Sequence, residues 1–299
     1  MSDLCLDAPR KIRLSWSRLK TYEQCRRRAQ LMGQGKKSPI TDGRNFLPGT
    51  LADRAMRLYL EEGLFEPGGM DKFLDQLWLD HTGPDAEYRI KWRGNPTEDQ
   101  NTVLRTVRRS LKVLEPILLE KVAPYAYKPE YRFTSTLGIK DLNGDTAHIE
   151  IFGAIDVAVH FGDGRYGLYD LKITENDGYI RSTLAQLTFY NIAFRGWTGV
   201  HPQEHAFWTP MLKTPVISID VTDAERWQMY ARIIDYCHGV WAGHHELTAD
   251  ESNCFNCPTK HACPRFTSPI EKDEQGRNRV SFVRAPFDLM HTPELETSE

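Results

Sequence analysis

Two apolar segments decide the fold of this chain: Gly153-Ala154-Ile155-Asp156-Val157-Ala158-Val159 and Tyr169-Asp170-Leu171-Lys172-Ile173. Both have the composition of buried strands, and the turn sequence Gly162-Asp163-Gly164 lies between them. Asp170 follows Asp156 by 14 positions, which fits two neighbouring strands joined by that turn. Because alternate side chains of a strand share a face, Asp170 and Lys172 are expected on one side of the sheet.

Asp156 and Asp170 stand among apolar residues, where an unpaired charge is unfavourable. A solvated position or an ion pair is the ordinary explanation of one such acid. Two acids with Lys172 nearby favour a metal site instead, because carboxylate oxygens suit Mg²⁺ and Mn²⁺. A divalent cation neutralises a phosphodiester and lowers the pKa of an attacking water, and an amine can orient that water. The pattern therefore predicts a metal site suited to cutting nucleic acid.

The surrounding chain predicts a mixed α/β core with a helical N-terminal elaboration. Ser15 and Thr222 are expected to cap helices, and Pro116 to kink or split a long helix near its end. We divide the chain into a helical region 1–124, a core 125–245, a cysteine segment 246–267 and a mobile tail 268–299. Helices are expected at 15–31, 50–62, 70–81, 97–122, 179–194 and 222–242, and strands at 130–137, 147–161, 166–173, 204–210 and 216–221.

The composition is that of an ordinary globular protein. The 299 residues carry a net charge of -3, so any nucleic-acid-binding surface must be a local cluster of Lys and Arg. The start of the chain lacks the apolar segment of a secretory signal, and no apolar run approaches the roughly 20 residues that span a bilayer. We therefore expect a cytoplasmic protein without a membrane partner.

Four of the six cysteines form a pattern of metal ligands. Cys254, Cys257 and Cys263 lie close together, and Cys25 lies 229 positions before Cys254, so a shared site would tie the two ends of the chain together. Close thiolates suit a soft metal or an iron–sulfur cluster. A tetrahedral zinc is the alternative, and free thiols are the third.

The order of these motifs resembles the PD-(D/E)XK nuclease superfamily, and within it the RecB-like branch of CRISPR-associated and phage exonucleases. The matching residues are Asp156, Asp170-x-Lys172, Gln186-x-x-x-Tyr190, the opening segment from Leu14-Ser15-Trp16-Ser17 to Cys25, the strand with Glu130, and Cys254-x-x-Cys257-x5-Cys263-Pro264. The resemblance spans about residues 13 to 266. It implies a restriction-endonuclease-like core, a mixed central sheet flanked by helices, with an N-terminal helical cap and a cysteine lid.

The resemblance also implies roles for individual residues. Asp156 and Asp170 would bind Mg²⁺ or Mn²⁺, with the Leu171 carbonyl as a third ligand and Glu130 as an outer one. Lys172 would position the attacking water. Gln186 and Tyr190, one helical turn apart, would contact DNA or support the site. Cys25, Cys254, Cys257 and Cys263 would hold a 4Fe–4S cluster with a structural role.

One position departs from the pattern of the family. The early helix usually carries Gly-x-x-x-His with a metal-binding histidine, whereas this chain has Gly49-Thr50-Leu51-Ala52-Asp53. A carboxylate at Asp53 can replace the imidazole as a ligand of Mg²⁺ or Mn²⁺. The alternative is a degraded site, in which Asp53 is only a surface residue of the helix.

We therefore expect a metal-dependent deoxyribonuclease. The resemblance favours an exonuclease on single-stranded ends with 5′ to 3′ polarity, in recombination, repair, phage replication (then in the host cytoplasm) or CRISPR spacer processing, with a helicase or recombination partner. The cluster Arg26-Arg27-Arg28 is the candidate for phosphate binding, against a helix end that the basic residues merely complement. The rival functions are an iron–sulfur protein that binds DNA or a partner without cutting, and a zinc-stapled or RNA-cutting enzyme.

Overall fold

The structure is a computed structural model that describes residues 12–35, 40–63, 65–84, 86, 89–92, 94–246, 254, 257–267, 271–272 and 278–279. Most of the expected tail at 268–299 lies outside these residues. Among the described helices, none has the length and hydrophobicity needed to cross a bilayer.

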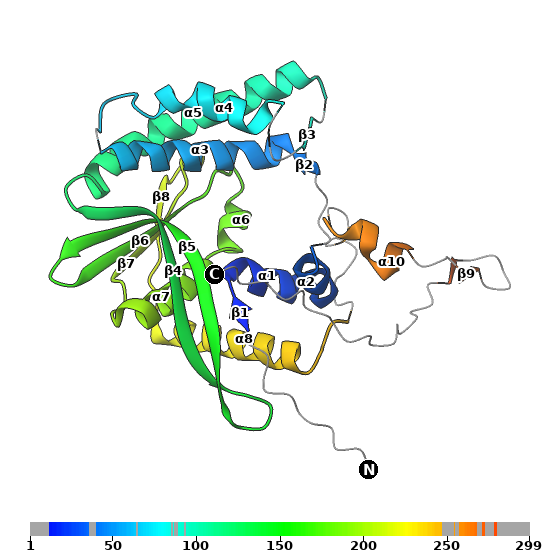
Figure 1. Ribbon diagram of the computed structural model, residues 1–299. Coiled ribbons are helices and arrows are strands. Elements are labelled where there is room, and N and C mark those ends of the chain that lie inside the picture. The colour runs from blue at the N-terminus through cyan, green and yellow to red at the C-terminus, as the bar shows by residue number, and fades with distance from the viewer. Residues whose placement is uncertain are drawn as a thin grey trace, which may run out of the picture.

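A mixed six-stranded sheet forms the centre of the molecule, which confirms the expected fold class (Figure 1). The strand order is β1-β5-β6-β7-β8, and β4 also pairs with β5. β5 is antiparallel to β4 and to β6, and β7 is antiparallel to β8, whereas β1 runs parallel to β5 and β6 runs parallel to β7. The strands are β1 (Arg13–Leu14), β4 (Ala126–Lys140), β5 (Thr146–Gly162), β6 (Arg165–Leu171), β7 (Glu204–Trp208) and β8 (Val216–Ser218).

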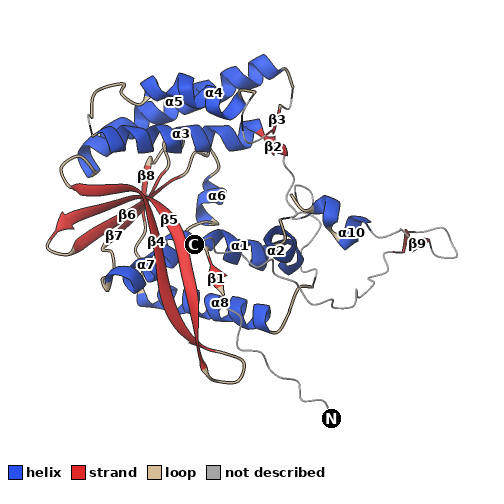
Figure 2. Cartoon of the chain, viewed as in Figure 1, coloured by secondary structure: helices blue, strands red, loops and turns tan. Residues whose placement is uncertain are grey.

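Helices cover both faces of the sheet, and each face has its own core (Figures 1 and 2). α3, α4 and α5 pack on one face, and α1, α7 and α8 pack on the other. The helices are α1 (Trp16–Gln24), α2 (Arg26–Gly33), α3 (Gly43–Glu62), α4 (Leu74–Thr82), α5 (Pro96–Lys121), α6 (Asp177–Arg181), α7 (Ala185–Thr198), α8 (Asp223–Trp241) and α10 (Pro264–Thr267).

Short elements complete the chain. β2 (Ile40–Asp42) pairs with β3 (Arg89–Lys91) near the start of α3, and β9 (Glu271–Lys272) pairs with β10 (Asn278–Arg279). The helices of region 1–124 do not share one core, since α1 packs with α7 and α8 while α3, α4 and α5 pack on the opposite face. The proposed division at residue 124 stays a prediction.

The helix expected at 15–31 is two helices that meet at Cys25. The expected Ser15 cap is confirmed, because its side chain accepts the Arg18 N–H. Cys25 has extended backbone angles, ends α1 and caps α2, and its Sγ accepts the Arg28 N–H at 3.4 Å. A cysteine that serves as both caps has no recognisable sequence signal, so the pattern suggested one continuous helix.

Proline interrupts the long helices less than expected. Pro116 was expected to kink or split its helix near the end. It does not split the helix, because α5 continues through it to Lys121. The proline removes one backbone hydrogen bond, but Pro116 is exposed and the buried face of α5 holds both sides of the break. That face consists of Val103, Val107, Leu111, Leu114 and Leu118. α3 likewise begins at Gly43 and runs through Pro48.

The helix expected at 179–194 is also divided. α6 ends at Arg181, a turn follows, and α7 begins at Ala185 with Gln186 in its first turn. Every residue from Gln186 to Phe194 is buried, so packing of the sheet and α8 around α7 fixes its position. The predicted capping of α8 is confirmed by a capping box, in which Thr222 and Glu225 each accept the backbone N–H of the other.

Candidate metal-dependent active site

The sheet brings the two predicted acids together. The antiparallel register pairs Val157 with Tyr169 and Ala158 with Leu168, so the next positions, Asp156 and Asp170, lie level on neighbouring strands. Asp170 is the penultimate residue of β6 and only 2% exposed. Lys172 follows the strand, and its N–H donates to the Trp208 carbonyl at 2.8 Å. Lys172 therefore stays in line with β6 and on the side of Asp170.

Asp170 is the most firmly held member of the group. Its Oδ1 accepts a hydrogen bond from Gln186 Nε2 at 2.8 Å, and its Oδ2 forms an ion pair with Lys172 Nζ. Gln186 Nε2 also lies 2.9 Å from the Tyr190 hydroxyl, which accepts from it. The first turns of α7 thus fix one oxygen of Asp170 and Lys172 fixes the other.

Asp156 is anchored by the neighbouring strand. Its Oδ2 accepts the Leu171 N–H at 2.7 Å. Burial raises the pKa of Asp156 well above its usual value, and the negative charges of Asp170 and Asp53 raise it further. Lys172 opposes this effect only in part. Asp156 therefore belongs to a group of acids whose charges repel one another.

Asp53 lies within the electrostatic reach of these acids. Burial raises its pKa to about 6, Arg57 opposes that shift, and Asp170 and Glu130 add to it. α3 therefore carries Asp53 toward the sheet, and Asp53 is not a plain surface residue of the helix. We define the acidic site as Asp53, Asp156, Asp170 and Lys172, with Gln186 and Tyr190 beside it.

The lysine and the tyrosine have pKa values that match this setting. Burial lowers the pKa of Lys172, but the carboxylates of Asp170 and Asp156 outweigh burial and raise it above its usual value. Lys172 is therefore a permanent cation of the site. Burial raises the pKa of Tyr190, as do Asp170 and Asp156, so Tyr190 stays a neutral hydroxyl.

Glu130 has other partners than the acidic site. Its carboxylate forms ion pairs with Arg57 and with Arg132. Burial raises its pKa, but these two arginines outweigh burial and hold it below the usual value. Glu130 lies level with Asp156 on β4, with a backbone φ of 43° in the left-handed region. Its expected role as an outer ligand stays a prediction.

The donors of the acidic site suit a hard divalent cation. They are carboxylate oxygens, buried and charged against one another, and a bound cation would relieve that repulsion. In the arrangement described, Lys172 neutralises Asp170, and within the described residues no three such ligands converge on one point. Asp156, Asp170 and Asp53 are the residues of this site that could hold a divalent ion.

One basic residue at the site was missed. Lys20 on α1 has a pKa lowered by burial and by the nearby charge of Lys172. Its Nζ also lies 5.4 Å from the centre of the Tyr179 ring on α6. Lys20 stands between apolar positions of an amphipathic helix, so nothing in its sequence context distinguishes it from a solvated lysine.

The cysteines expected to share a site approach one another. Cys25 and Cys263 are buried, and Cys254 and Cys257 are half-buried. After burial, the thiol of Cys263 has its pKa raised by the charges of Cys25, Cys257 and Cys254. Within the described residues, however, the thiols do not reach a metal-binding arrangement. Cys237 is a buried thiol, and Cys5 lies outside the described residues.

The arginines expected to bind phosphate already have partners in the protein. Arg26 pairs with Glu246 and lies 5.2 Å from the Tyr22 ring. Arg27 donates to Gln30 at 2.7 Å and Arg28 to Gln24 at 3.3 Å. All three are half-buried at the N-terminus of α2, where a positive charge opposes the helix dipole. The same residues directly follow the C-terminus of α1, where a positive charge complements the dipole, so phosphate binding and the helix-end alternative both stay predictions.

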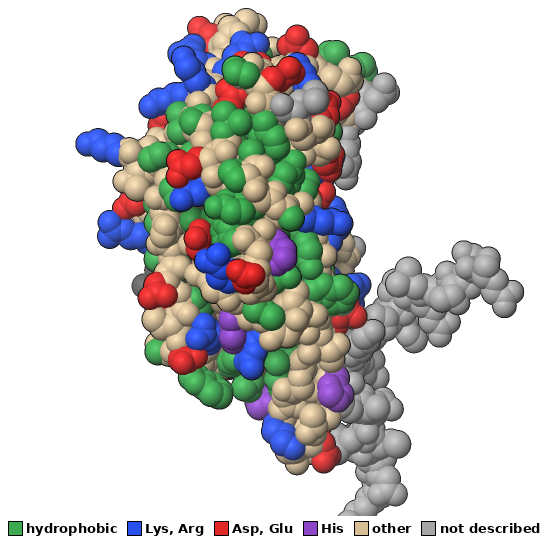
Figure 3. Space-filling model, turned by 90° about the vertical axis from the view of Figure 1, so that its left-hand side faces the viewer, with side chains coloured by type: hydrophobic (Ala, Val, Ile, Leu, Met, Phe, Trp, Pro, Cys, Tyr) green, Lys and Arg blue, Asp and Glu red, His purple; other side chains and the backbone are tan. Residues whose placement is uncertain are grey.

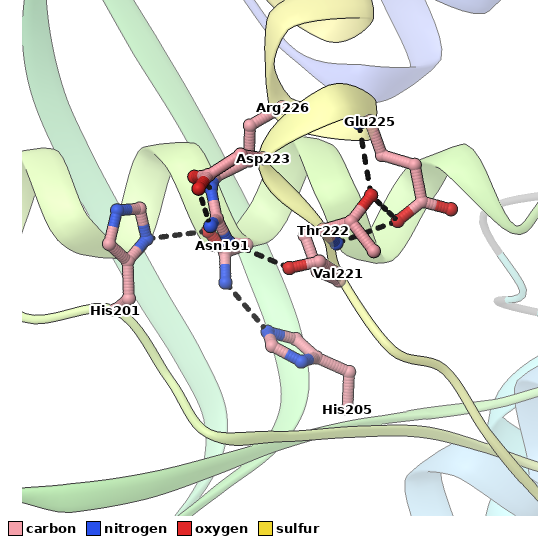
Figure 4. Close-up of polar contacts among 8 residues, drawn as sticks. All are labelled: Asn191, His201, His205, Val221, Thr222, Asp223, Glu225 and Arg226. Carbon is pink, nitrogen blue, oxygen red and sulfur yellow. Dashed lines mark hydrogen bonds and ion pairs between the residues drawn. The ribbon is translucent and has the colours of Figure 1, made fainter.

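A second buried polar group was also not predicted as a unit (Figure 4). Asn191 on α7 donates its Nδ2 to His205 Nε2 at 3.0 Å, and its Oδ1 lies 2.7 Å from His201 Nδ1. Burial lowers the pKa of His205 to about 4, and nearby Arg226 lowers it further. We name Asn191, His201 and His205 the Asn191 network.

Comparisons with known proteins bear on the site. The model of the PD-(D/E)XK nuclease superfamily matches residues 13–264. The chain is similar to the crystal structure of SSO0001, with 12% identity and a TM-score of 0.34, over 84% of this chain and 95% of that one. It is also similar to a candidate exonuclease from Eubacterium rectale, with 16% identity and a TM-score of 0.43, over 88% and 93%. Neither structural similarity carries functional weight at these values. A search of curated proteins gave no match.

Proposed function

Because the chain belongs to the PD-(D/E)XK nuclease superfamily, we propose that its acidic site is an active nuclease centre that hydrolyses DNA with Mg²⁺ or Mn²⁺. The single observation behind the proposal is the position of Asp170, 2% exposed and held by Lys172 on one side and by Gln186 on the other, level with Asp156. This arrangement holds charge in a buried place where folding alone would favour apolar residues.

Each residue has a part in the proposed reaction. Asp156, Asp170 and Asp53 would hold the divalent ion, with the Leu171 carbonyl as the further ligand and Glu130 in an outer position. When bound, the ion neutralises the scissile phosphate and lowers the pKa of a bound water. Lys172, charged at neutral pH, orients the water or stabilises the charge that develops on the phosphate.

The α7 residues act on Asp170 and on the strand being cut. Gln186 fixes the orientation of the Asp170 carboxylate through its Nε2. Tyr190 keeps its proton, so its hydroxyl can donate a hydrogen bond to a phosphate or base oxygen. Lys20, whose pKa is lowered, adds a second amine beside Lys172. Tyr190 and Lys20 would position the DNA strand, and neither residue is a proposed ligand of the metal.

We further propose an exonuclease of the RecB-like branch that prefers single-stranded ends and works from 5′ to 3′. The support is the order of motifs from the Ser15 helix to Cys263, not the shape of the acidic site. Arg26, Arg27 and Arg28 would contact the strand near the cysteine segment. A helicase or recombination partner and a cytoplasmic location belong to the same proposal.

The test is cleavage of end-labelled single- and double-stranded DNA and of RNA, with Mg²⁺ or Mn²⁺. Wild type is compared with Lys172→Ala and with Lys213→Ala, whose exposed lysine lies in the turn between β7 and β8. We expect wild type and Lys213→Ala to cut DNA, with a ladder that gives the polarity, and Lys172→Ala to be inactive. Binding of DNA without cutting by wild type in either metal would contradict the proposal and favour a binding protein.

We also propose that Cys25, Cys254, Cys257 and Cys263 hold a 4Fe–4S cluster that joins α2 to the cysteine segment. The pKa of Cys263, raised by burial and then by Cys25, Cys257 and Cys254, supports it, as does the hydrogen bond from the Arg28 N–H to Cys25. Protein prepared without oxygen should contain iron and sulfide and absorb visible light, and Cys263→Ser should lose both. Stoichiometric zinc with no visible absorbance would favour the zinc alternative.

A further inference from the structure

Four basic residues form a stripe on the outer face of α5. Arg105, Arg108, Arg109 and Lys112 follow the spacing i, i+3, i+4 and i+7, which places all four on one side of the helix. All four are exposed, while the opposite side of α5 is buried against α3. We name these residues the basic stripe. At 1.5 Å per residue it extends for about 10 Å.

The basic stripe carries four positive charges on one side of α5. In the part of the chain that the structure describes, none of the four side chains forms an ion pair. Like charges three and four positions apart destabilise a helix. This separates the stripe from Arg26, Arg27 and Arg28, whose guanidinium groups already have partners within the protein. The stripe is therefore a local cationic surface on a chain of net charge -3.

The stripe lines a groove with a volume of about 920 Å³. The facing wall is the loop between α3 and α4, with Gly68, Met70 and Asp71. That loop is fixed to α5, because the Gly68 N–H donates to Glu115 Oε1 at 2.7 Å. Figure 3 shows Lys and Arg side chains around the top of the molecule, the level at which Figure 1 places α4 and α5.

We propose that this groove is an accessory binding site for the phosphodiester backbone of the DNA substrate. The inference rests on the proposed function, because α3 links the two sites: Asp53 on α3 faces the acidic site, and the opposite side of α3 packs against α5. A row of exposed cations suits successive phosphates. None of the described residues that line the groove is aromatic, so the groove would hold the strand without reading its sequence.

The experiment measures DNA binding rather than cleavage. Fluorescence anisotropy with labelled single-stranded DNA is recorded in chelator between about 50 and 200 mM KCl. Wild type is compared with a variant carrying Arg105→Gln, Arg108→Gln, Arg109→Gln and Lys112→Gln. The charge-matched control carries Lys140→Gln, Arg165→Gln, Arg195→Gln and Lys213→Gln, which are exposed residues of other elements. Circular dichroism checks that both variants fold.

We expect the stripe variant to bind DNA at least tenfold more weakly, with a plot of log affinity against log salt less steep by about 3, since each single-strand phosphate contact contributes about 0.7 to that slope. The control should keep the slope of wild type. Equal slopes and affinities for the stripe variant and the control would overturn the inference. If the stripe variant does not fold, Arg108→Glu alone supplies the same comparison with a smaller change.

The two proposals fail separately. If wild type cuts DNA but the stripe variant binds like the control, the accessory site is wrong and the nuclease proposal stands. If wild type binds DNA with a stripe-dependent slope but cuts nothing with either metal, the nuclease proposal is wrong and the binding site stands.

Discussion

The acidic site and the Asn191 network are both buried polar groups beside the same sheet, but their internal balance differs. In the Asn191 network the amide bonds to both imidazoles, and burial keeps His205 neutral. In the acidic site three carboxylates share one close lysine, and burial raises the pKa of each acid. The first group is satisfied by the protein alone. The second also has partners in the protein, but its carboxylates still repel one another, and protons or an added cation would relieve that repulsion, which is the property expected of a functional site.

The largest expected effect concerns Asp170. Asp170→Asn removes a charge of the proposed metal site and the ion-pair partner of the Lys172 ammonium, so we expect cleavage to fall by about 10³-fold or more. Asp220→Asn, at an exposed position just before α8, is the matched control and should cut like wild type. Rates of product formation at saturating Mn²⁺ provide the measurement. Cleavage by Asp170→Asn within tenfold of wild type would contradict the functional role that distinguishes the acidic site from the Asn191 network.

Substitution of Asp53 should raise the stability of the protein and lower its activity. Asp53→Asn removes a buried charge whose pKa is about 6, so at pH 8 without metal we expect the melting temperature to rise by about 2–4 °C. The same variant should cut about 10- to 100-fold more slowly, because one ligand of the proposed metal site is lost. Asp53→His, which restores the usual residue of the family, should cut within tenfold of wild type. A lower melting temperature for Asp53→Asn would show that the carboxylate has a stabilising partner.

Substitution in the Asn191 network should lower stability and leave activity unchanged. Asn191→Ala leaves two imidazoles without their hydrogen bonds, and His205 is only 4% exposed, so we expect a loss of about 2 kcal/mol of unfolding free energy. Cleavage per folded molecule should not change. Urea denaturation and cleavage at the same temperature measure both quantities. A tenfold loss of cleavage with stability unchanged would assign the network to the active site instead.

The last prediction concerns the pH dependence of stability. The pKa of His205 is lowered from its usual value of 6.5 to about 4, so the folded state takes up the proton less readily than the unfolded state. The stabilising contribution of neutral His205 is complete above pH 6.5 and is lost as the pH falls toward 4, by at most about 1.4 kcal/mol per pH unit. His205→Gln should flatten this decline. Wild type and variant curves that stay parallel between these pH values would contradict the assignment.

The acids act in the opposite direction on stability. Their raised pKa values destabilise the metal-free protein at high pH, and this cost diminishes as the acids become protonated. Metal binding has the reverse sign, since protons compete with the cation. For this reason the difference between wild type and His205→Gln, not the wild-type curve alone, isolates His205.

The core and the acidic pair were predictable because their signals are local. The turn at Gly162 to Gly164 fixes the register that sets Asp156 level with Asp170, and the capping box of α8 is a sequence motif. β1 was missed because two residues carry no periodic pattern, and its pairing with β5 is a long-range contact. The break at Cys25 was missed because a cysteine rarely caps a helix.

The surroundings of the site depended on tertiary structure. The sequence context of Lys20 is that of an ordinary surface lysine, and its neighbour Lys172 is distant along the chain. The contact between Asn191 and His201 likewise has no sequence signal, so only the packed structure reveals these roles. The basic stripe was different: its spacing is visible in the sequence, but the same helix was interpreted from its apolar residues alone. The polar face of a helix can therefore also indicate a binding surface, when its charged residues all have the same sign.

The most direct test of the central claim is a calorimetric titration of Mn²⁺ into chelator-treated protein at pH 7.5, for wild type, Asp170→Asn and Asn191→Ala. All three keep the four cysteines of the proposed cluster, so differences in binding report the acidic site. The account predicts that wild type and Asn191→Ala bind Mn²⁺ alike and that Asp170→Asn loses this binding. Equal binding by Asp170→Asn and wild type, or no binding by wild type, would contradict the claim that the buried acids form a divalent-metal site.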